Sequence, residues 1–238
     1  ALAAQPAADA SSAMRMLANA RSSDVVIEAV WNLGSLGGSK EELVKKLADG
    51  DTDIRANSVA ALARTLSRSN DGPNFAARAC ALLDDTSPLV RANVLGGLAL
   101  TKTRCADGEK ERRLLEEDTR DIVREAAARA LHAAPSTNRA EDERTLLRCA
   151  LRDGTESVAE TCANGPPPAE MGTAPSTIFV VPPTQRTPAP NARYILAYAN
   201  GLYRIGTTDR RGAIVDPIAP RGELRLVRLE ESAQGRTR

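Results

Sequence analysis

The chain has 238 residues, of which 42% are hydrophobic and 26% are charged, and its formal net charge is +1. This is the composition of an ordinary globular protein, and the charge balance argues against long-range steering to nucleic acid or to an anionic membrane. No apolar run approaches the roughly 20 residues that a membrane-spanning helix needs. Charge is nevertheless uneven: residues 173–238 hold ten arginines and five acids (net +5), and residues 1–172 hold 22 basic and 26 acidic residues (net −4). Two modules of opposite charge are therefore expected.

The chain begins with the small-residue stretch ALAAQPAADASSAMRM. Residues 1–9 are expected to form a flexible N-terminus. Such a stretch is typical of the end that signal cleavage leaves, or of a chain cut at an arbitrary boundary, and both interpretations stay open.

One phrase recurs along the first two thirds of the chain. DTDIRANSVAALARTL at 51–66 is followed by DTSPLVRANVLGGLAL at 85–100, and IVREAAARAL at 122–131 is a third copy. Weaker copies at 23–34 and 153–163 have Glu28 and Ala159 where the stronger copies have Arg. Self-similarity at a period near 35 residues predicts a solenoid of helix pairs, because one pair cannot bury its apolar face alone.

An apolar stretch with helical spacing precedes each copy, and short Asp, Ser, Pro and Gly segments divide the helices. We therefore expect five helical hairpins, at residues 10–36, 39–68, 73–102, 109–133 and 139–163. The predicted fold class is mainly α: an α-solenoid over residues 10–164, followed by a small antiparallel β domain.

An Asp and an Arg occupy fixed places in the repeat. The Asp lies six residues before the Arg, and the Arg follows an aliphatic residue. With this signature the chain resembles HEAT repeats over roughly residues 10–163, particularly the short bacterial kind also seen in phycobilisome-lyase-like proteins. In that family the two residues form a ladder between neighbouring repeats. The resemblance therefore implies a structural role, rather than an anion site, for Asp49, Arg55, Asp85, Arg91, Asp118 and Arg124.

After residue 163 the composition changes. NGPPPAEMGTAP predicts a helix stop and a stiff linker at 165–175. Residues 176–231 are expected to form a β-sandwich-like module, and 232–238 a disordered tail. Thr208, Asp209, Gly212, Pro220 and Gly222 give the module a resemblance to carboxypeptidase-regulatory or prealbumin-like domains. Because so few strands make a marginal core, and because the two modules differ in charge, we expect it to dock against the last helical repeat.

Asn200-Gly201 predicts a two-residue hairpin turn. With that turn Tyr198 faces Tyr203, and Arg204 lies on one face of the sheet with Ala197 and Ala199. The opposite face then holds Tyr194, Leu196, Tyr198, Tyr203 and Ile205.

Four cysteines occur, and none has the CxxC spacing of a zinc site. The favoured interpretation is four buried or partly buried thiols. Cys149 and Cys162 flank one interhelical loop, so a disulfide between them is the alternative, and it would stabilise the fold by about 3 kcal/mol. Cys80 and Cys105 are expected to lie too far apart, since Cys105 is placed at the far end of the next helix.

The sequence assigns no catalytic, cofactor-binding or metal-binding residue, and no cofactor is expected. His132 is the one histidine and is expected to interact with the last carbonyls of its helix. No metalloprotease motif, phosphate loop or nucleophile elbow occurs. Trp31, the one tryptophan, is expected in the core, and the alternative is an anchor for a partner at the open end of the solenoid.

These patterns predict a non-catalytic protein–protein interaction scaffold that uses the concave face of the solenoid, with the β module as an accessory. Its partner would be another protein, and the chain itself a monomer or weak oligomer. One alternative is a chromophore lyase or other small-molecule enzyme, which needs an exposed reactive thiol or acid. Another is a nucleic-acid-binding HEAT-like protein, which needs a basic stripe and is disfavoured by the net charge of the helices. The expected location is extracytoplasmic in a bacterium (periplasm or cell surface), with the cytoplasm as the alternative.

Overall fold

The computed structural model describes residues 9–166, 172, 174–182 and 185–230. Residues 1–8 of the expected flexible N-terminus, most of the linker and the C-terminal tail lie outside the described residues. Asp9, expected to belong to that N-terminus, instead caps the first helix. Its carboxylate accepts a 2.6 Å hydrogen bond from the Ser12 amide.

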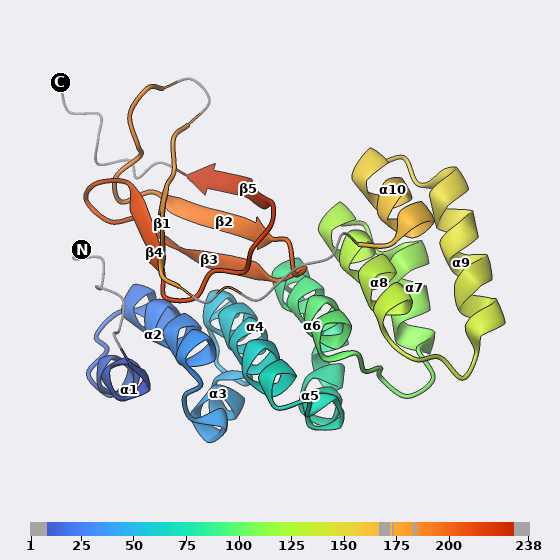
Figure 1. Cartoon of the computed structure of the whole chain (residues 1–238), viewed down its shortest axis with the longest axis horizontal. Helices are drawn as coiled ribbons and strands as arrows, with labels where there is room; N and C mark the ends of the chain where they lie inside the picture. Colours follow the sequence, from blue (N-terminus) through green and yellow to red (C-terminus); the bar gives the residue numbers. More distant parts are fainter. Residues whose placement is uncertain (1–8, 167–171, 173, 183–184, 231–238) are drawn as a thin grey trace.

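The helical part consists of five hairpins in two layers (Figure 1). The fold class, mainly α with a small antiparallel β part, is confirmed, and the hairpins begin and end within one residue of the expected ranges. The hairpins are α1 (Ala10–Ala18) with α2 (Ser23–Leu36), α3 (Lys40–Lys46) with α4 (Thr52–Arg68), α5 (Gly72–Ala79) and a 3₁₀ segment (Cys80–Asp84) with α6 (Pro88–Thr101), α7 (Glu109–Glu117) with α8 (Asp121–Ala133), and α9 (Arg139–Arg152) with α10 (Glu156–Asn164).

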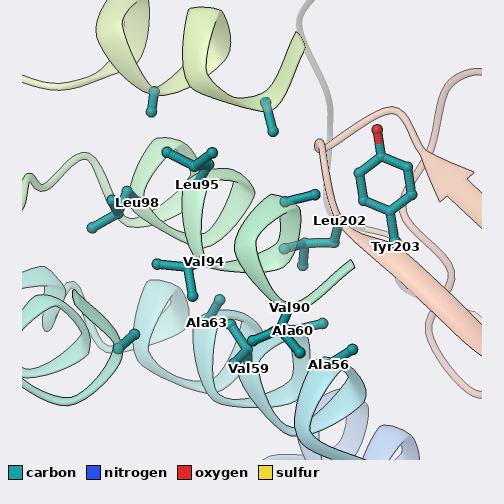
Figure 2. Packing of buried hydrophobic residues seen from close by; sticks show 14 of the residues in the cluster. Ala56, Val59, Ala60, Ala63, Val90, Val94, Leu95, Leu98, Leu202 and Tyr203 are labelled. Carbon is teal, nitrogen blue, oxygen red and sulfur yellow. The ribbon is translucent and has the colours of Figure 1, made fainter. Parts of the chain in front are cut away.

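The even-numbered helices form an inner layer in which each helix packs against the next. Small and β-branched residues on their facing sides let the helices approach closely, and burial of this surface is the main stabilising contribution. Figure 2 shows Val90 and Val94 of α6 packed between that helix and Val59, Ala60 and Ala63 of α4, whereas Leu95 points away from α4; all of these side chains are fully buried.

Two small antiparallel sheets make up the β module. β1 (Ser176–Phe179) pairs with β4 (Ala213–Asp216), and β2 (Arg193–Tyr198) lies between β3 (Tyr203–Thr207) and β5 (Leu224–Glu230). The module lies over the inner layer at α2, α4 and α6 (Figure 1), and β3 is the strand that contacts all three helices. The expected docking against the last helical repeat is therefore wrong.

The β2–β3 turn differs from the predicted two-residue turn. The Tyr198 amide donates to the Leu202 carbonyl, and the Tyr198 carbonyl accepts from the Gly201 amide. The loop between the strands therefore has three residues, 199–201. A two-residue type I′ turn needs positive φ at both central residues, but only Gly201 has it (82°), and the Asn200 side chain instead accepts a bond from the Leu202 amide. Ala197, not Tyr198, consequently faces Tyr203.

This slip of one residue turns every β3 side chain to the opposite face of the sheet. Arg204 faces Leu196, within the core, and Tyr203 lies with Ala197 on the other face. The expectation that Arg204 shares a face with Ala197 is therefore wrong.

All four cysteines form disulfides, so the favoured interpretation of free thiols is wrong. Cys149 pairs with Cys162 across the last hairpin, with 6.0 Å between the Cα atoms. Cys80 pairs with Cys105 at 5.6 Å, against expectation. The reason is that α6 ends at Thr101 and Lys102 adopts a left-handed backbone (φ 52°), so the chain turns back before it reaches Cys105.

Candidate functional site

The repeated Asp and Arg side chains join neighbouring hairpins. Arg55 donates from Nε and Nη2 to the Asp85 carboxylate at 2.9 and 3.1 Å, and from Nη1 to the Asp49 carbonyl at 2.8 Å. Burial would raise the pKa of the Asp85 carboxyl, but hydrogen bonds from Arg55 and Ser87 outweigh it and lower the pKa. The same contacts between adjacent hairpins recur for Arg91 with Asp118 and for Arg124 with Asp153.

The asparagines of the Arg-Ala-Asn phrase hold the β module. The Asn57 amide donates to the Ile205 carbonyl (3.0 Å) and accepts from the Ile205 amide (3.2 Å). The Asn93 amide does the same with Tyr203, at 2.9 and 2.7 Å. Each side chain thus takes the place of a neighbouring strand along the edge of β3. Sequence reasoning missed this role, although an Asn retained in two copies at a buried helix position was a usable signal.

Glu28 departs from the repeat because it faces the β module. In the strong copies its position is held by Arg, and Asp49, which has no Arg partner from the first hairpin, pairs with Lys46 at 2.9 Å. Glu28 instead accepts a 2.7 Å bond from Arg204 of β3. At this position the first hairpin thus contacts the β module, whereas the strong copies contact the next hairpin.

Trp31 lies at the centre of the contact between the modules. Its side chain is 1% exposed, its indole N–H donates to Asp216 Oδ2 at 3.0 Å, and its ring stacks on Tyr198 with centroids 5.4 Å apart. The Tyr198 hydroxyl donates to the same carboxylate oxygen at 2.8 Å. Trp31 is therefore in the core, as expected, and its side chain is not available as an anchor for another protein.

Two buried guanidinium groups neutralise this carboxylate. Arg64 and Arg204 lie 3.7 and 3.6 Å from the Asp216 oxygens, and both lie over the Trp31 ring, at 4.7 and 5.3 Å from its centroid. Burial would raise the pKa of Asp216, but the two guanidinium charges outweigh it and lower the pKa. These groups act structurally, because none of them is accessible to a substrate.

The β module contacts α8 through Arg225 and the Ala199 carbonyl, but it does not pack closely over α8 and α10 as it does over the first three inner helices. Between α8, α10 and the β2–β3 hairpin lies an open cleft of about 590 Å³, a volume typical of ligand pockets. One side presents Glu125, Ser157 and Glu160 from the helices, and the other presents Ala197, Tyr203 and Arg225 from the sheet.

Charges are arranged unevenly within the cleft. Glu125 accepts from Arg129 and from Arg225, both at 3.0 Å, so two guanidinium groups share one carboxylate. Glu160 and Glu223 are exposed, and no ion pair of theirs is found among the residues that the structure describes. The cleft is thus lined by a cluster of two arginines sharing one glutamate and by two further exposed glutamates.

The described residues contain no group of three or more His, Cys, Asp or Glu side chains placed to hold a metal ion. His132 Nε2 lies 3.1 Å from the carbonyl of Cys162 near the end of α10, not from a carbonyl of its own helix. With both disulfides closed, no thiol is present to serve the enzyme interpretation.

No protein-family model and no curated protein matches the chain. Within the described residues, no helix is long and apolar enough to cross a membrane.

Proposed function

We propose that the protein is a non-catalytic scaffold that binds a segment of another protein in the cleft between α8, α10 and the β module. The observation that supports this is the division of the inner layer. The β module covers α2, α4 and α6, whereas α8 and α10 present polar side chains to an open cleft. The binding surface is thus narrower than the whole concave face.

The alternatives have less support. A lyase or other small-molecule enzyme would need a reactive thiol or an acid with a raised pKa in the cleft, and all four cysteines are in disulfides. A nucleic-acid-binding surface would need unpaired arginines in a stripe, whereas Arg129 and Arg225 of the cleft are both paired with Glu125.

We further propose that the helical part belongs with HEAT repeats and that the protein works outside the cytoplasm. The ladder of Arg and Asp between hairpins supports the first proposal. The two disulfides support the second, because structural disulfides persist in oxidising compartments.

Site-specific photo-crosslinking tests the proposed function. A benzophenone amino acid replaces Ser157, which lines the cleft, or Thr137, which is exposed in the loop between α8 and α9. In a lysate of the source organism we expect one discrete crosslinked protein from position 157 and none from position 137. Crosslinks that are equal at both positions, or absent from position 157, would contradict a binding cleft.

A further inference from the structure

Two exposed leucines lie on the outer helix of the last hairpin. Leu147 and Leu151 are 60% and 76% exposed, and they lie about one helical turn apart on α9. α9 is the last outer helix of the described solenoid and lies at the right-hand end of the row of helices in Figure 1. Terminal repeats of a solenoid usually present polar side chains to solvent. An apolar pair in this place indicates a surface that another molecule covers.

The preceding hairpin shows which way the two leucines face. In α7, Arg112 lies six residues before the ladder aspartate Asp118, and it donates to Asp142 of the next hairpin at 2.8 Å. Glu116 lies two residues before Asp118 and accepts from Arg148 of the next hairpin at 3.0 Å. Both of these α7 side chains therefore face the hairpin that follows theirs.

Leu147 and Leu151 occupy the same two places in α9, six and two residues before Asp153. They therefore face the position that a sixth hairpin would take, and the described chain contains no such hairpin. The inner helix shows the same replacement, because Ala159 of α10 stands where α8 has Arg124, the partner of Asp153. On this surface, the end face, apolar side chains thus replace the polar ones that join one hairpin to the next.

The repeat also indicates what covers the end face. A further repeat of the same kind would bring a ladder aspartate to Ala159, where that carboxylate would find no arginine. The first hairpin has no exposed large apolar side chain among the residues that the structure describes, so a head-to-tail stack of copies would not match the leucines. A second copy of the end face does match them, because a two-fold axis places the same patch on both sides of the contact.

The charges around the end face allow two copies to meet. Arg139 and Glu143, both exposed, pair with each other at 2.8 Å and add no net charge. Arg152 and Glu156 lie exposed on either side of the interhelical loop, and no ion pair of theirs is found within the described part of the chain. Because these two charges are opposite, each copy offers both signs to the other.

We propose that the end face is a dimer interface, at which two copies of this chain pack their last hairpins against each other about a two-fold axis. Leu147 and Leu151 of each copy lose their contact with water there, and this burial drives the association. The dimer presents two copies of the cleft, but the interface does not depend on what the cleft binds.

Sedimentation equilibrium of the full, disulfide-bonded chain tests this interface. Between about 1 μM and about 1 mM, the range for a small apolar contact, we expect the mass to rise from monomer to dimer and stop there. Leu147→Glu and Leu151→Glu should each weaken dimerisation by about tenfold or more, because a carboxylate would be buried without a partner. Phe179→Glu, at a β1 side chain that is 56% exposed, is the matched control and should leave dimerisation unchanged. Thermal unfolding of each variant establishes that it is folded.

Added salt separates an apolar contact from attraction between the oppositely charged parts of the chain. The dimer should persist in about 0.5 M sodium chloride, where interactions between exposed charges are largely screened. Dissociation at this salt concentration would mean that the contact is electrostatic, and it would overturn the proposal.

The remaining outcomes are equally decisive. A monomer at every concentration, or a dimer that both leucine substitutions leave unchanged, overturns the interface. An equal loss of dimerisation in Phe179→Glu also overturns it, because the contact would then involve the β module. Growth beyond the dimer would replace the two-fold arrangement by a head-to-tail stack.

Discussion

The inner layer of the solenoid has two halves that are built from the same repeat and used differently. Over the first three hairpins a strand of the β module crosses the helices, and alternate residues of β3 bond to successive helices: Thr207 to Asp24, Ile205 to Asn57, and Tyr203 to Asn93. Over the last two hairpins the β module makes only side-chain contacts with Glu125 and Arg129 among those described, and a cleft remains beside them.

One position of the repeat marks where the halves meet. It lies three residues after the aliphatic residue that precedes Arg, and it is Asn57 in α4 and Asn93 in α6, but Ala126 in α8. A side-chain amide appears where a strand edge has to be satisfied and disappears where the strand ends. The difference teaches that the common part of the repeat stacks helices, whereas inward polar positions bind the β module: this asparagine in α4 and α6, and Asp24 and Glu28 in α2, which has Val30 at the asparagine position.

We expect the largest loss of stability from a substitution at the centre of the contact between the β module and the first three hairpins. Asp216→Ala removes the one carboxylate shared by two buried guanidinium groups, and should lower the free energy of unfolding by about 3–5 kcal/mol. Urea unfolding measures the loss. Asp107→Ala, at an exposed aspartate that accepts only the Glu109 amide and a 4.0 Å ion pair with Arg112 among the side-chain contacts described, is the control and should cost about 1 kcal/mol or less. A loss below 1 kcal/mol for Asp216→Ala would contradict the account.

The stability of the last hairpin, in the half that contains the cleft, should depend on the disulfide between Cys149 and Cys162. Replacing both Cys149 and Cys162 by Ser should cost about 3 kcal/mol, because the unfolded chain regains the freedom of a closed loop. Hydrogen exchange should accelerate in α9 and α10 while α2 and α4 keep their protection. Uniform acceleration along the chain would show that the two halves are not separable.

The amide bonds to β3 should have an intermediate effect. Asn93→Ala leaves both the amide and the carbonyl of Tyr203 without a partner, and should cost about 2–3 kcal/mol. Asn74→Ala, whose amide pairs only with exposed groups, is the control. If the two variants unfold at the same urea concentration, the strand is not held in the way described.

Lowering the pH should gradually reduce the free energy of unfolding that the Arg–Asp contacts between hairpins contribute, by less than the substitutions above. In the folded chain the pKa values of Asp85 and Asp153 are below 3.8, because guanidinium hydrogen bonds favour the ionised carboxylates. This contribution is complete above pH about 4 and is lost as the pH falls through the folded pKa values. Unfolding midpoints should therefore fall below pH about 4, less steeply in Asp85→Asn. Urea unfolding midpoints that stay unchanged from pH 5 to pH 3 would contradict a stabilising role for these ion pairs.

The sequence was informative where the determinants are local. The hairpins follow from apolar spacing within about 35 residues, and the Asp and Arg pattern indicates the contacts between hairpins. The β2–β3 register was not accessible in this way, because Asn-Gly favours a two-residue turn in isolation. In the folded chain the hairpin tip packs against α6, where a Cβ on Gly96 would lie 2.2 Å from the Gly201 carbonyl oxygen.

The candidate site was harder to predict for the same physical reason. Tyr203 and Arg225 reach the cleft only through the register of three strands, and Glu125 and Arg129 reach it from a helix roughly 70 to 100 residues earlier. The pairing of Cys80 with Cys105 likewise depends on where α6 ends. Such contacts between distant segments have no periodic signature in the sequence.

Native-state hydrogen exchange of the Tyr203 and Ile205 amides tests the central claim most directly. Both backbone amides donate to a side-chain oxygen, of Asn93 and Asn57 respectively, rather than to a carbonyl of β2 or of another strand. We predict strong protection of both in the wild type, with Asn93→Ala accelerating Tyr203 first and Asn57→Ala accelerating Ile205 first. Exchange in the wild type as fast as that of an exposed edge strand would contradict the claim that the repeated asparagines hold the β module.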